Sequence, residues 1–428
     1  MIVLYNPKVT KPRNRRMPLS VLAIAAVLEG KEEYAIVDGN LDPSPTATIT
    51  GLMKERHVEA LGVTVMPGPQ IVSAVTSCRE LRARFPQVPI VWGGYFPSLY
   101  TAAALNAPYV DFAVRSQGEE TFLELLQALR GERDFRSIAG LAFKDKPGEH
   151  RHNPERMMKS PGDFPWFPYH RIPVENYLLP TFLGRRTAVH QASAGCPYAC
   201  NFCGVISAYR SREKMEAPAL TEGVLRHLVS TYGADSVQFF DNNFFLREDH
   251  ARELAERLES LRLRWWCEAR IDILLRYSDV TLEALRRAGC AMIFFGAEAG
   301  SDWALQEMNK NLTTEQTLEL ARIARPGADV YLSNFRPAAH ARGWQRTFRH
   351  GDELVEAPSC AHSLDSIRRE FESAGFQVVH CEEPHLGEPE GPIFAWRGKA
   401  DFLAAASETP ALYVFHFRAR QRLRLEVA

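Results

Sequence analysis

The chain has 428 residues, of which 46% are hydrophobic and 24% charged, and its formal net charge is −1. These values are typical of a globular chain of two or three domains, and they argue against a large basic surface for nucleic acid. No apolar run reaches the roughly 18 residues of a membrane span, and Met1–Pro7 reads as a strand rather than a signal peptide. Eight cysteines, three of them clustered, predict a reducing, cytoplasmic location.

Residues 1–145 alternate short apolar runs with helical patterns. The pattern predicts an α/β fold whose first domain is a doubly wound parallel sheet. Ligands of such sheets bind beyond the carboxyl ends of the strands. The site would therefore be edged by Asn6-Pro7, Asp38–Asn40, Val65–Gly68 and Gly93-Gly94. The first turn has no Gly-x-Gly-x-x-Gly, which disfavours a dinucleotide site. Strands are predicted at 2–6, 34–38, 60–65, 89–92 and 111–114, and helices at 19–28, 46–56, 70–85, 98–105 and 119–129.

Residues 146–188 are rich in proline and other breakers and predict a linker. Its aromatic residues Trp166, Phe167 and Tyr169 are expected to pack on a surface. The strand–helix rhythm resumes at residue 189, which predicts a partial βα barrel over 189–325 with its chemistry at the carboxyl ends of the strands. Strands are predicted at 236–241, 263–268 and 291–296, and helices at 219–232, 248–260, 280–288 and 302–308.

Three cysteines lie within eight residues in the stretch Ser193–Gly204. Cys196, Cys200 and Cys203 are separated by three and then two residues. Thiolates this close suit one soft metal centre, and no fourth ligand follows at zinc-finger spacing. The spacing therefore favours an iron–sulfur cluster with one iron left open. The alternatives are a zinc site completed by Cys267 or His190, and three unrelated thiols.

This stretch resembles the signature of the radical S-adenosylmethionine (SAM) enzymes, including the aromatic residue before the third cysteine, Phe202. The resemblance implies that the three cysteines hold a 4Fe-4S cluster, which cleaves SAM to a 5′-deoxyadenosyl radical. Phe202 would line the adenine. Matching the strand ends to the family implies further SAM contacts, each of which would otherwise be a strand-end cap or salt bridge. These contacts are Asp241, Asn243, Arg270 and Glu298.

Trp92–Ser98 and Ser116–Glu120 resemble the cobalamin-binding domain that precedes many radical SAM domains. Paired glycines admit a bulky ligand close to the backbone, although a plain Gly-Gly turn is the alternative. The cobalamin contacts that the resemblance implies are Asp38, Asn40, Val65, Met66, Gly93, Gly94, Tyr95, Gly118 and Glu119.

The Asp-x-His-x-x-Gly motif of cobalamin mutases is absent, and His57 is the only histidine before His150. We therefore expect no protein imidazole on the lower face of the cobalt.

Residues 326–428 resemble the carboxyl-terminal part of a SAM-dependent methyltransferase of the Rossmann-like class. No Gly-rich half precedes them, so this segment alone should not bind SAM. Its predicted strand–helix–strand unit spans about 329–334, 365–374 and 376–381. The unit either pairs beside Ala291–Phe295 and fills the gap in the barrel, or forms a separate lobe on a joint at Arg325–Gly327.

These features predict a cobalamin-dependent radical SAM enzyme, similar to the group that contains the anaerobic magnesium-protoporphyrin ester cyclase and lipid-methylating members. Its reaction would be methyl transfer or cyclisation at an unactivated carbon of a small-molecule substrate. The expected partner is an electron donor such as flavodoxin or ferredoxin, with no nucleic acid and no membrane span. The alternatives are a truncated relative that keeps the cluster but is inactive, a methyltransferase-like binding protein, and a zinc-stapled structural protein.

Overall fold

The structure is a computed structural model of the chain. It describes residues 1–10, 14–146 and 149–323, together with the backbone of five strands between residues 329 and 419. The chain divides into two compact units, Met1–Phe295 and Gly296–Ala428.

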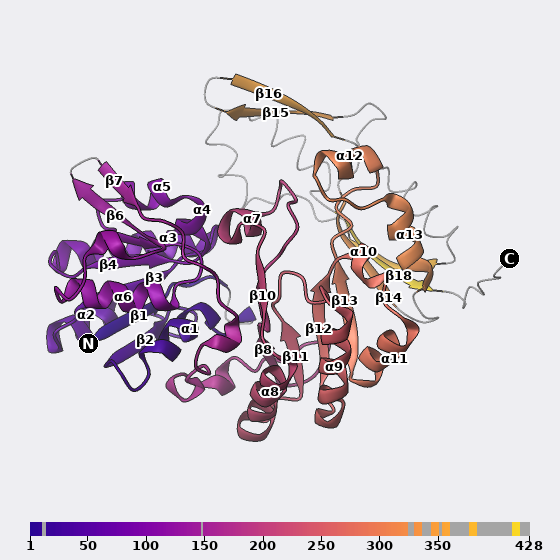
Figure 1. Cartoon of the computed structure of the whole chain (residues 1–428), viewed down its shortest axis with the longest axis horizontal. Helices are drawn as coiled ribbons and strands as arrows, with labels where there is room; N and C mark the ends of the chain where they lie inside the picture. The colour runs from indigo at the N-terminus through magenta and orange to yellow at the C-terminus, as the bar shows by residue number, and fades with distance from the viewer. Residues whose placement is uncertain are drawn as a thin grey trace. The chain divides into compact units, whose positions relative to one another are not determined.

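Seven strands form the first sheet, in the order β2-β1-β3-β4-β5-β6-β7 (Figure 1). Strands β1 to β5 are parallel, whereas β6 and β7 run antiparallel to their neighbours. The order changes direction at β1 and β3, and sheets of this topology bind ligands beyond the strand ends there. The bounds are β1 (Ile2–Asn6), β2 (Tyr34–Asp38), β3 (Ala60–Thr64), β4 (Ile90–Gly93), β5 (Phe112–Val114), β6 (Leu141–Lys146) and β7 (Glu149–His152).

Helices cover both faces of this sheet, because successive residues of a buried strand point to opposite sides. Val3 and Tyr5 of β1 lie in the core shared with α2, α3 and α5, whereas Ile2 and Leu4 lie in the core shared with α1 and α6. This confirms the predicted doubly wound α/β fold. The helices are α1 (Leu19–Leu28), α2 (Pro45–Glu55), α3 (Pro69–Arg84), α4 (Tyr95–Leu99), α5 (Thr101–Asn106) and α6 (Glu119–Leu129).

The antiparallel hairpin β6–β7 is absent from the predicted strands. Residues 149–152 were assigned to the linker, but they pair with β6 and extend the sheet. The strand signal is weak there because β7 is an edge strand whose side chains are charged or polar and mostly exposed. The predicted helix at 98–105 is two helices, α4 and α5, which meet at Tyr100.

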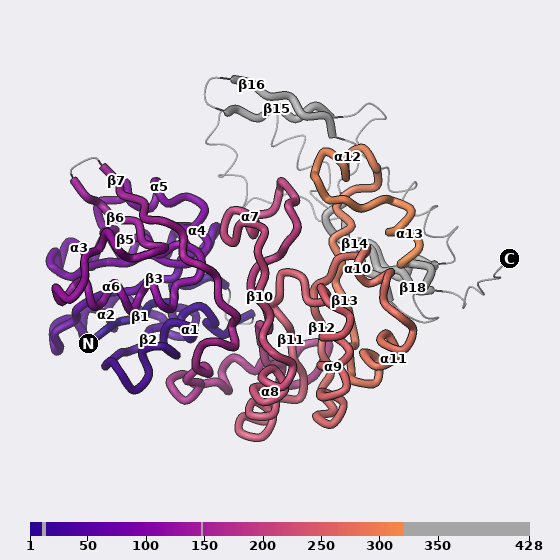
Figure 2. The backbone as a smooth tube through the Cα atoms, in the orientation of Figure 1, coloured from indigo at the N-terminus to yellow at the C-terminus, as the bar shows by residue number. Residues whose placement is uncertain are grey.

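Four parallel strands form the second sheet, in the order β13-β12-β11-β8. This is the predicted partial βα barrel, and Figure 2 follows the chain through its alternating strands and helices. The strands are β8 (Thr187–His190), β11 (Ser236–Phe239), β12 (Arg264–Ala269) and β13 (Cys290–Phe295), and the helices between them are α8 (Pro218–Tyr232), α9 (Glu248–Leu258), α10 (Ile271–Leu274) and α11 (Asp279–Arg287). Between β8 and α8 lie β9 (Ser193–Gly195), α7 (Gly204–Tyr209) and β10 (Glu213–Met215).

The segment between the two sheets packs on the second one. Tyr169 is buried against His227 and Tyr232 of α8, as the surface packing of its aromatic residues predicted. Farther along, the hydroxyl of Tyr177 donates to Asp38 at the end of β2. The segment is therefore anchored at both sheets.

The second unit contains α12 (Asp302–Glu307) and α13 (Thr314–Ile323). Its strand β18 lies between β14 and β17 and is antiparallel to both. Among the described strands β13 pairs with β12, and β14 pairs with β18. Whether Val330–Leu332 also pairs beside β13 or belongs to a separate lobe stays a prediction. The predicted helix at 365–374 and the joint at 325–327 lie outside the described residues. The five strands are β14 (Asp329–Phe335), β15 (Trp344–His350), β16 (Glu353–Ser359), β17 (Phe376–Glu382) and β18 (Tyr413–Ala419).

Within the part of the chain that the structure describes, no helix has the length and apolar character that crossing a membrane requires.

Candidate cofactor site

The three cysteines lie in the loop between β9 and α7, beyond the carboxyl end of β8. Gly195 has φ +83°, and a Cβ atom there would lie 2.1 Å from the carbonyl oxygen of Arg212, so only glycine fits. Gly195 also pairs with Glu213 of β10. The amide of Cys203 donates to the carbonyl oxygen of Cys200 at 3.0 Å. Backbone geometry therefore fixes the start of the loop and brings its last two cysteines together.

The cysteines are free thiols, with Cys200 buried and Cys196 and Cys203 partly buried. Burial raises the pKa of the Cys196 thiol, which disfavours the free thiolate. A metal centre reverses this preference, because a coordinated thiol loses its proton. Among the described residues no three His, Cys, Asp or Glu side chains converge to hold a single metal ion. Ligation of a cubane cluster does not require that convergence, since each cysteine binds a different iron.

The two residues that a zinc site would borrow have other partners. The Nε2 atom of His190 lies 2.6 Å from Oε1 of Glu216, and both side chains are buried. Cys267 is buried in β12, where it interacts with Cys290. A structural zinc needs four ligands in a tetrahedron. The described arrangement therefore disfavours the zinc alternative.

Asp241, a predicted SAM contact, is joined to the hairpin that carries the cysteine loop. Its Oδ1 accepts from the hydroxyl of Ser193 at 2.6 Å, and its Oδ2 accepts from the amide of Ala192 at 3.2 Å. Since Asp241 follows β11 and Ser193 begins β9, the carboxylate ties the hairpin to the middle of the sheet. The structure thus gives Asp241 a positioning role, and its contact with SAM stays a prediction.

Burial raises the pKa of Asp241 to about 7. The folded protein therefore holds this proton more tightly than the unfolded chain, so stability falls as the pH rises from about 4 to about 7. The pKa of His190 is also raised: burial lowers it, but the charges of Glu216 and Asp241 outweigh the burial. The contribution of His190 to stability likewise falls as the pH rises past the ordinary pKa of a histidine.

We expect Asp241→Asn to flatten this pH dependence, because the amide carries no charge to desolvate. Thermal unfolding of both proteins between pH 5 and 8 checks it. The melting temperature of the variant minus that of wild type should increase by a few degrees as the pH rises. A change of ~1 kcal/mol in unfolding free energy moves the Tm of a large domain by ~2–4 °C. In the control Asp235→Asn, desolvation raises the pKa of an exposed carboxyl, but hydrogen bonds from backbone amides and Ser236 outweigh it and hold the pKa low. The Tm of that variant relative to wild type should not rise with pH. Parallel plots of Tm against pH for wild type and Asp241→Asn would contradict the raised pKa of Asp241.

Arg270, another predicted SAM contact, lies against the cysteine loop. It follows β12 directly and is buried, and its guanidinium carbon lies 3.7 Å from the ring centroid of Tyr198. Its Nη1 atom lies 3.6 Å from Sγ of Cys200, and its Nε donates to Oδ1 of Asp272 at 2.9 Å. Tyr198 and Asp272 are absent from the contacts predicted from the sequence. The Arg-x-Asp spacing and the aromatic residue between two cysteines were the available signals.

Asn243 is a buried polar side chain beyond the end of β11. It is 1% exposed, and neither its amide oxygen nor its amide nitrogen has a hydrogen-bond partner among the described residues. A buried amide without partners costs about 1–3 kcal/mol. A ligand with polar groups, such as SAM, would satisfy it. Phe202, predicted to line the adenine, is half exposed.

Glu298, the remaining predicted SAM contact, belongs to the second unit. Its Oε1 lies 2.8 Å from Nζ of Lys310, whose side chain is only 9% exposed. The backbone of Glu298 has φ +62°, and a Cβ atom at Gly296 would lie 2.2 Å from its carboxylate. Gly296 therefore makes room for this ion pair, and the SAM contact of Glu298 stays a prediction.

The paired glycines lie at the carboxyl end of β4, as predicted. A Cβ atom on Gly93 would meet nothing closer than 4.0 Å, so open space adjoins its backbone. Gly94 has φ +93°, and a Cβ atom there would lie 3.1 Å from Oγ1 of Thr64. The first glycine thus leaves room beside the sheet and the second permits the turn. This open backbone fits a bulky, flat ligand such as cobalamin.

Asp38 and Asn40, two of the predicted cobalamin contacts, form hydrogen bonds with other residues of the protein. Oδ1 of Asp38 accepts from the side chain of Asn6 and from Asn40, each at 2.9 Å. Asn40 in turn accepts from the amides of Val9 and Thr10. These groups position the loops at the sheet edge, and their contact with cobalamin stays a prediction.

The other predicted cobalamin contacts surround the glycine turn. Val65 is buried, and its amide donates to the carbonyl of Gly93 at 2.8 Å, whereas Met66 is 47% exposed. Gly118 and Glu119 begin α6, and burial raises the pKa of the Glu119 carboxyl.

Tyr95 connects the glycine turn to the cysteine loop. Its ring lies 6.2 Å from that of Tyr209 in α7, and its hydroxyl is hydrogen-bonded to Tyr209 and Asn242. Burial raises the pKa of Tyr95, and the thiol of Cys203 adds to the shift. The hydroxyl of Ser116 also donates to the carbonyl oxygen of Ala208. The predicted cobalamin edge and the predicted cluster loop therefore adjoin within the first unit.

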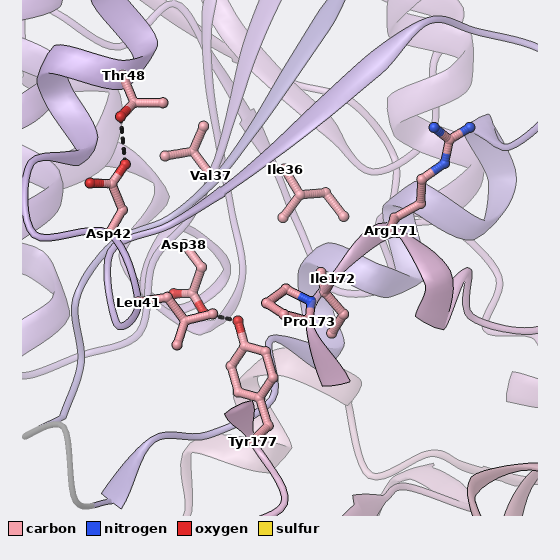
Figure 3. A pocket seen from close by; sticks show the side chains of 10 residues that line it. All are labelled: Ile36, Val37, Asp38, Leu41, Asp42, Thr48, Arg171, Ile172, Pro173 and Tyr177. Carbon is pink, nitrogen blue, oxygen red and sulfur yellow. Dashed lines mark hydrogen bonds between the residues drawn. The ribbon is translucent and has the colours of Figure 1, made fainter. Parts of the chain in front are cut away.

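A pocket of about 210 Å³ lies elsewhere, along the edge strand β2 (Figure 3). Its polar groups bond to one another: Thr48 donates to Asp42 at 2.6 Å, and Tyr177 donates to Asp38. Arg171, at its rim, pairs with Glu29. We assign no cofactor to this pocket, since only Asp38 of the predicted contacts lines it.

The fold and the cysteine loop define a class of protein with a cobalamin-type α/β domain followed by a radical SAM-type barrel. The B12 binding domain family matches residues 8–126, and the radical SAM superfamily matches residues 191–327. The chain therefore has a B12-binding domain followed by a radical SAM domain.

The chain resembles three curated relatives. An uncharacterized methyltransferase of Pyrococcus horikoshii is 25% identical, over 72% of this chain and 66% of the relative. The anaerobic magnesium-protoporphyrin IX monomethyl ester cyclase of Synechocystis is 26% identical, over 73% and 63%. The cytidylyl-2-hydroxyethylphosphonate methyltransferase of Streptomyces wedmorensis is 24% identical, over 76% and 70%. The chain thus spans slightly less than two thirds of the length of the first two relatives.

Two solved structures share the fold. The cobalamin-dependent SAM radical enzyme OxsB, with aqua-cobalamin and SAM bound, superposes with a TM-score of 0.61 at 18% identity, over 75% of this chain and 47% of that one. The radical SAM methyltransferase TsrM of Kitasatospora setae, with cobalamin and a [4Fe-4S] cluster bound, gives 0.60 at 19% identity, over 75% and 64%.

Proposed function

We propose that the protein is a radical SAM enzyme that holds a 4Fe-4S cluster, SAM and cobalamin, and that it carries out methyl transfer or cyclisation at an unactivated carbon. The observation that carries this proposal is the contact of Tyr95, beside the open glycine turn, with Tyr209 of α7, the helix that directly follows the three-cysteine loop. The names of the relatives, two methyltransferases and a cyclase, support the two reaction types.

Each cofactor has residues in the described chain that suit it. Cys196, Cys200 and Cys203 would hold the cluster, Asn243 offers polar atoms to SAM, and Gly93 leaves room for cobalamin. When bound, these groups supply the electron transfer, the cleavage of SAM and the methyl carrier. The protein's part is to bind and orient them and to keep water from the substrate.

The substrate and partners are part of the same proposal. A small molecule would bind between the glycine turn and the cysteine loop, since the two cofactors must reach the same carbon. The cluster needs a reductant, for which a flavodoxin or ferredoxin is suited. A cytoplasmic location, without nucleic acid as a partner, agrees with the free thiols and the net charge of −1.

Turnover by the reconstituted protein tests the proposal. Anaerobic incubation with SAM, a reductant and hydroxocobalamin should release 5′-deoxyadenosine, measured by liquid chromatography and mass spectrometry. The four-stranded sheet favours one rival, a relative that keeps the cluster without catalysis. Iron-loaded protein that released no 5′-deoxyadenosine with any of the relatives' substrates would favour that rival.

Replacement of Asn243 by leucine is expected to weaken SAM binding without loss of stability. The leucine keeps the volume and removes an amide that has no partner among the described residues, so the unfolding free energy should stay equal or rise. Loss of a hydrogen bond to the ligand should weaken binding by about 5- to 100-fold. Equilibrium dialysis with SAM and thermal unfolding measure the two effects.

Asn153→Leu is the matched control. Asn153 is also buried, but its amide donates to the carbonyls of Phe135 and Ile138 at 2.6 and 2.8 Å. This variant should lose stability and keep its SAM affinity. An Asn243 variant that behaved like the control would show that Asn243 has a structural role only.

A further inference from the structure

We propose that Arg270 is a positioning residue of the cysteine loop and that it raises the reduction potential of the cluster in the absence of SAM. The inference rests on the proposed function, because it requires Cys200 to be a cluster ligand. It departs from the expectation that the charge of Arg270 serves SAM.

Three parts of one guanidinium have three different neighbours. Its face stacks on Tyr198 at 3.7 Å, its Nε donates to Asp272 at 2.9 Å, and its Nη1 approaches the sulfur of Cys200 at 3.6 Å. Tyr198 and Cys200 belong to the cysteine loop, whereas Asp272 lies two residues beyond Arg270 in α10. The planar group therefore connects the loop to the carboxyl end of β12.

Because Arg270 is buried, its contacts depend on the charge and shape of the arginine side chain. The side chains of Arg270 and Asp272 are 7% and 10% exposed, so their charges are poorly screened by water. A compact ammonium cannot stack and donate in two directions at once, so lysine is not an equivalent replacement. The site thus uses the shape of arginine as well as its charge.

The same geometry sets the sign of the effect on the cluster. Reduction adds negative charge, and hydrogen bonds to the ligand sulfurs are among the factors that set the potential. A buried cation beside Cys200 favours the reduced form. The carboxylate of Asp272 opposes it, because it places a negative charge beside the same guanidinium. Loss of Arg270 should therefore lower the potential, and loss of the Asp272 charge should raise it.

Redox titrations of reconstituted full-length protein test this. The variants are Arg270→Lys, Arg270→Gln and Asp272→Asn, with Arg276→Gln as the control. Arg276 is a nearby arginine that is 66% exposed and 3.9 Å from Asp272. Iron per chain is measured first, then the midpoint potential by electron paramagnetic resonance without SAM, then the dissociation constant of SAM.

We expect Arg270→Gln to make reduction at least tenfold less favourable, which is about 59 mV for a one-electron couple. Arg270→Lys should give an intermediate shift, Asp272→Asn a shift of opposite sign, and Arg276→Gln none. If Arg270→Gln retains too little iron, the opposite shifts of Arg270→Lys and Asp272→Asn decide the matter. Unchanged potentials in both, with only weaker SAM binding in Arg270→Lys, would overturn the inference and assign Arg270 to SAM. Failure of wild-type protein to take up iron would instead refute the proposed function.

Discussion

Cys200→Ala is expected to be colourless after anaerobic reconstitution and unable to cleave SAM, whereas wild type should be brown with about four irons per chain. The reason is geometric. Cys200 is the buried member of the three, and its carbonyl accepts the amide of Cys203, so it lies at the centre of the loop. Iron analysis, the visible spectrum and 5′-deoxyadenosine release measure the loss.

Cysteines outside the loop provide the controls. Cys290→Ala changes a partly buried thiol of β13, and Cys360→Ala changes one that lies far along the chain from the motif. Both variants should keep colour and activity. Retention of iron by the variant lacking all three loop cysteines would refute the cluster assignment.

Gly93→Val is expected to weaken cobalamin binding at least tenfold, and Gly93→Ala to have a smaller effect of the same sign. In the free protein an added Cβ at this position meets nothing closer than 4.0 Å, so the alanine has room. A valine also suits a strand end. The side chain would occupy only the space that the ligand needs, so iron content and thermal stability should not change. Spectroscopic titration with hydroxocobalamin measures the affinity.

Gly51→Ala is the control, because a side chain there also enters open space, but in α2. Gly94 is unsuitable for this test, since its φ of +93° makes any substitution strained. Bound cob(II)alamin should show no nitrogen coupling from a protein imidazole. His57 is exposed and precedes β3, so it lies at the opposite end of the strand from the glycine turn. Equal cobalamin affinity in Gly93→Val and wild type would exclude the glycine turn as the binding edge.

The periodicity of the sequence predicted most strands and helices of both sheets, because buried strands and amphipathic helices leave strong local patterns. It missed β6 and β7, whose pairing depends on a neighbour and not on an apolar run. It also did not decide between the two arrangements of residues 326–428. The order β14-β18-β17 depends on contacts of β18 with β14, about 80 residues earlier, and with β17, about 30 residues earlier, and no local signal encodes them.

The candidate site also combines features that local sequence predicts with features that depend on the fold. The spacing of the three cysteines is a local signal and could be read directly. The stacking of Arg270 on Tyr198 is not local, because it depends on the strand order that brings the end of β12 to the loop after β9. The cobalamin contact of Asp38 stays a prediction, and its hydrogen bond with Asn6 was not foreseen, because it depends on the pairing of β1 with β2. A polar residue at the end of a predicted strand indicates that the residue lies at an edge of the sheet. The side chain to which it is hydrogen-bonded is known only from the folded structure.

The boundary after Phe295 has an evolutionary consequence. The cysteines, the hairpin β9–β10, Asp241 and the Arg270–Asp272 pair all precede it. Recombination at this boundary would therefore exchange Glu298 and the carboxyl-terminal segment while leaving these residues of the first unit unchanged. Lineages that exchanged the segment after Phe295 in this way would inherit the same cysteine loop with a different carboxyl-terminal part.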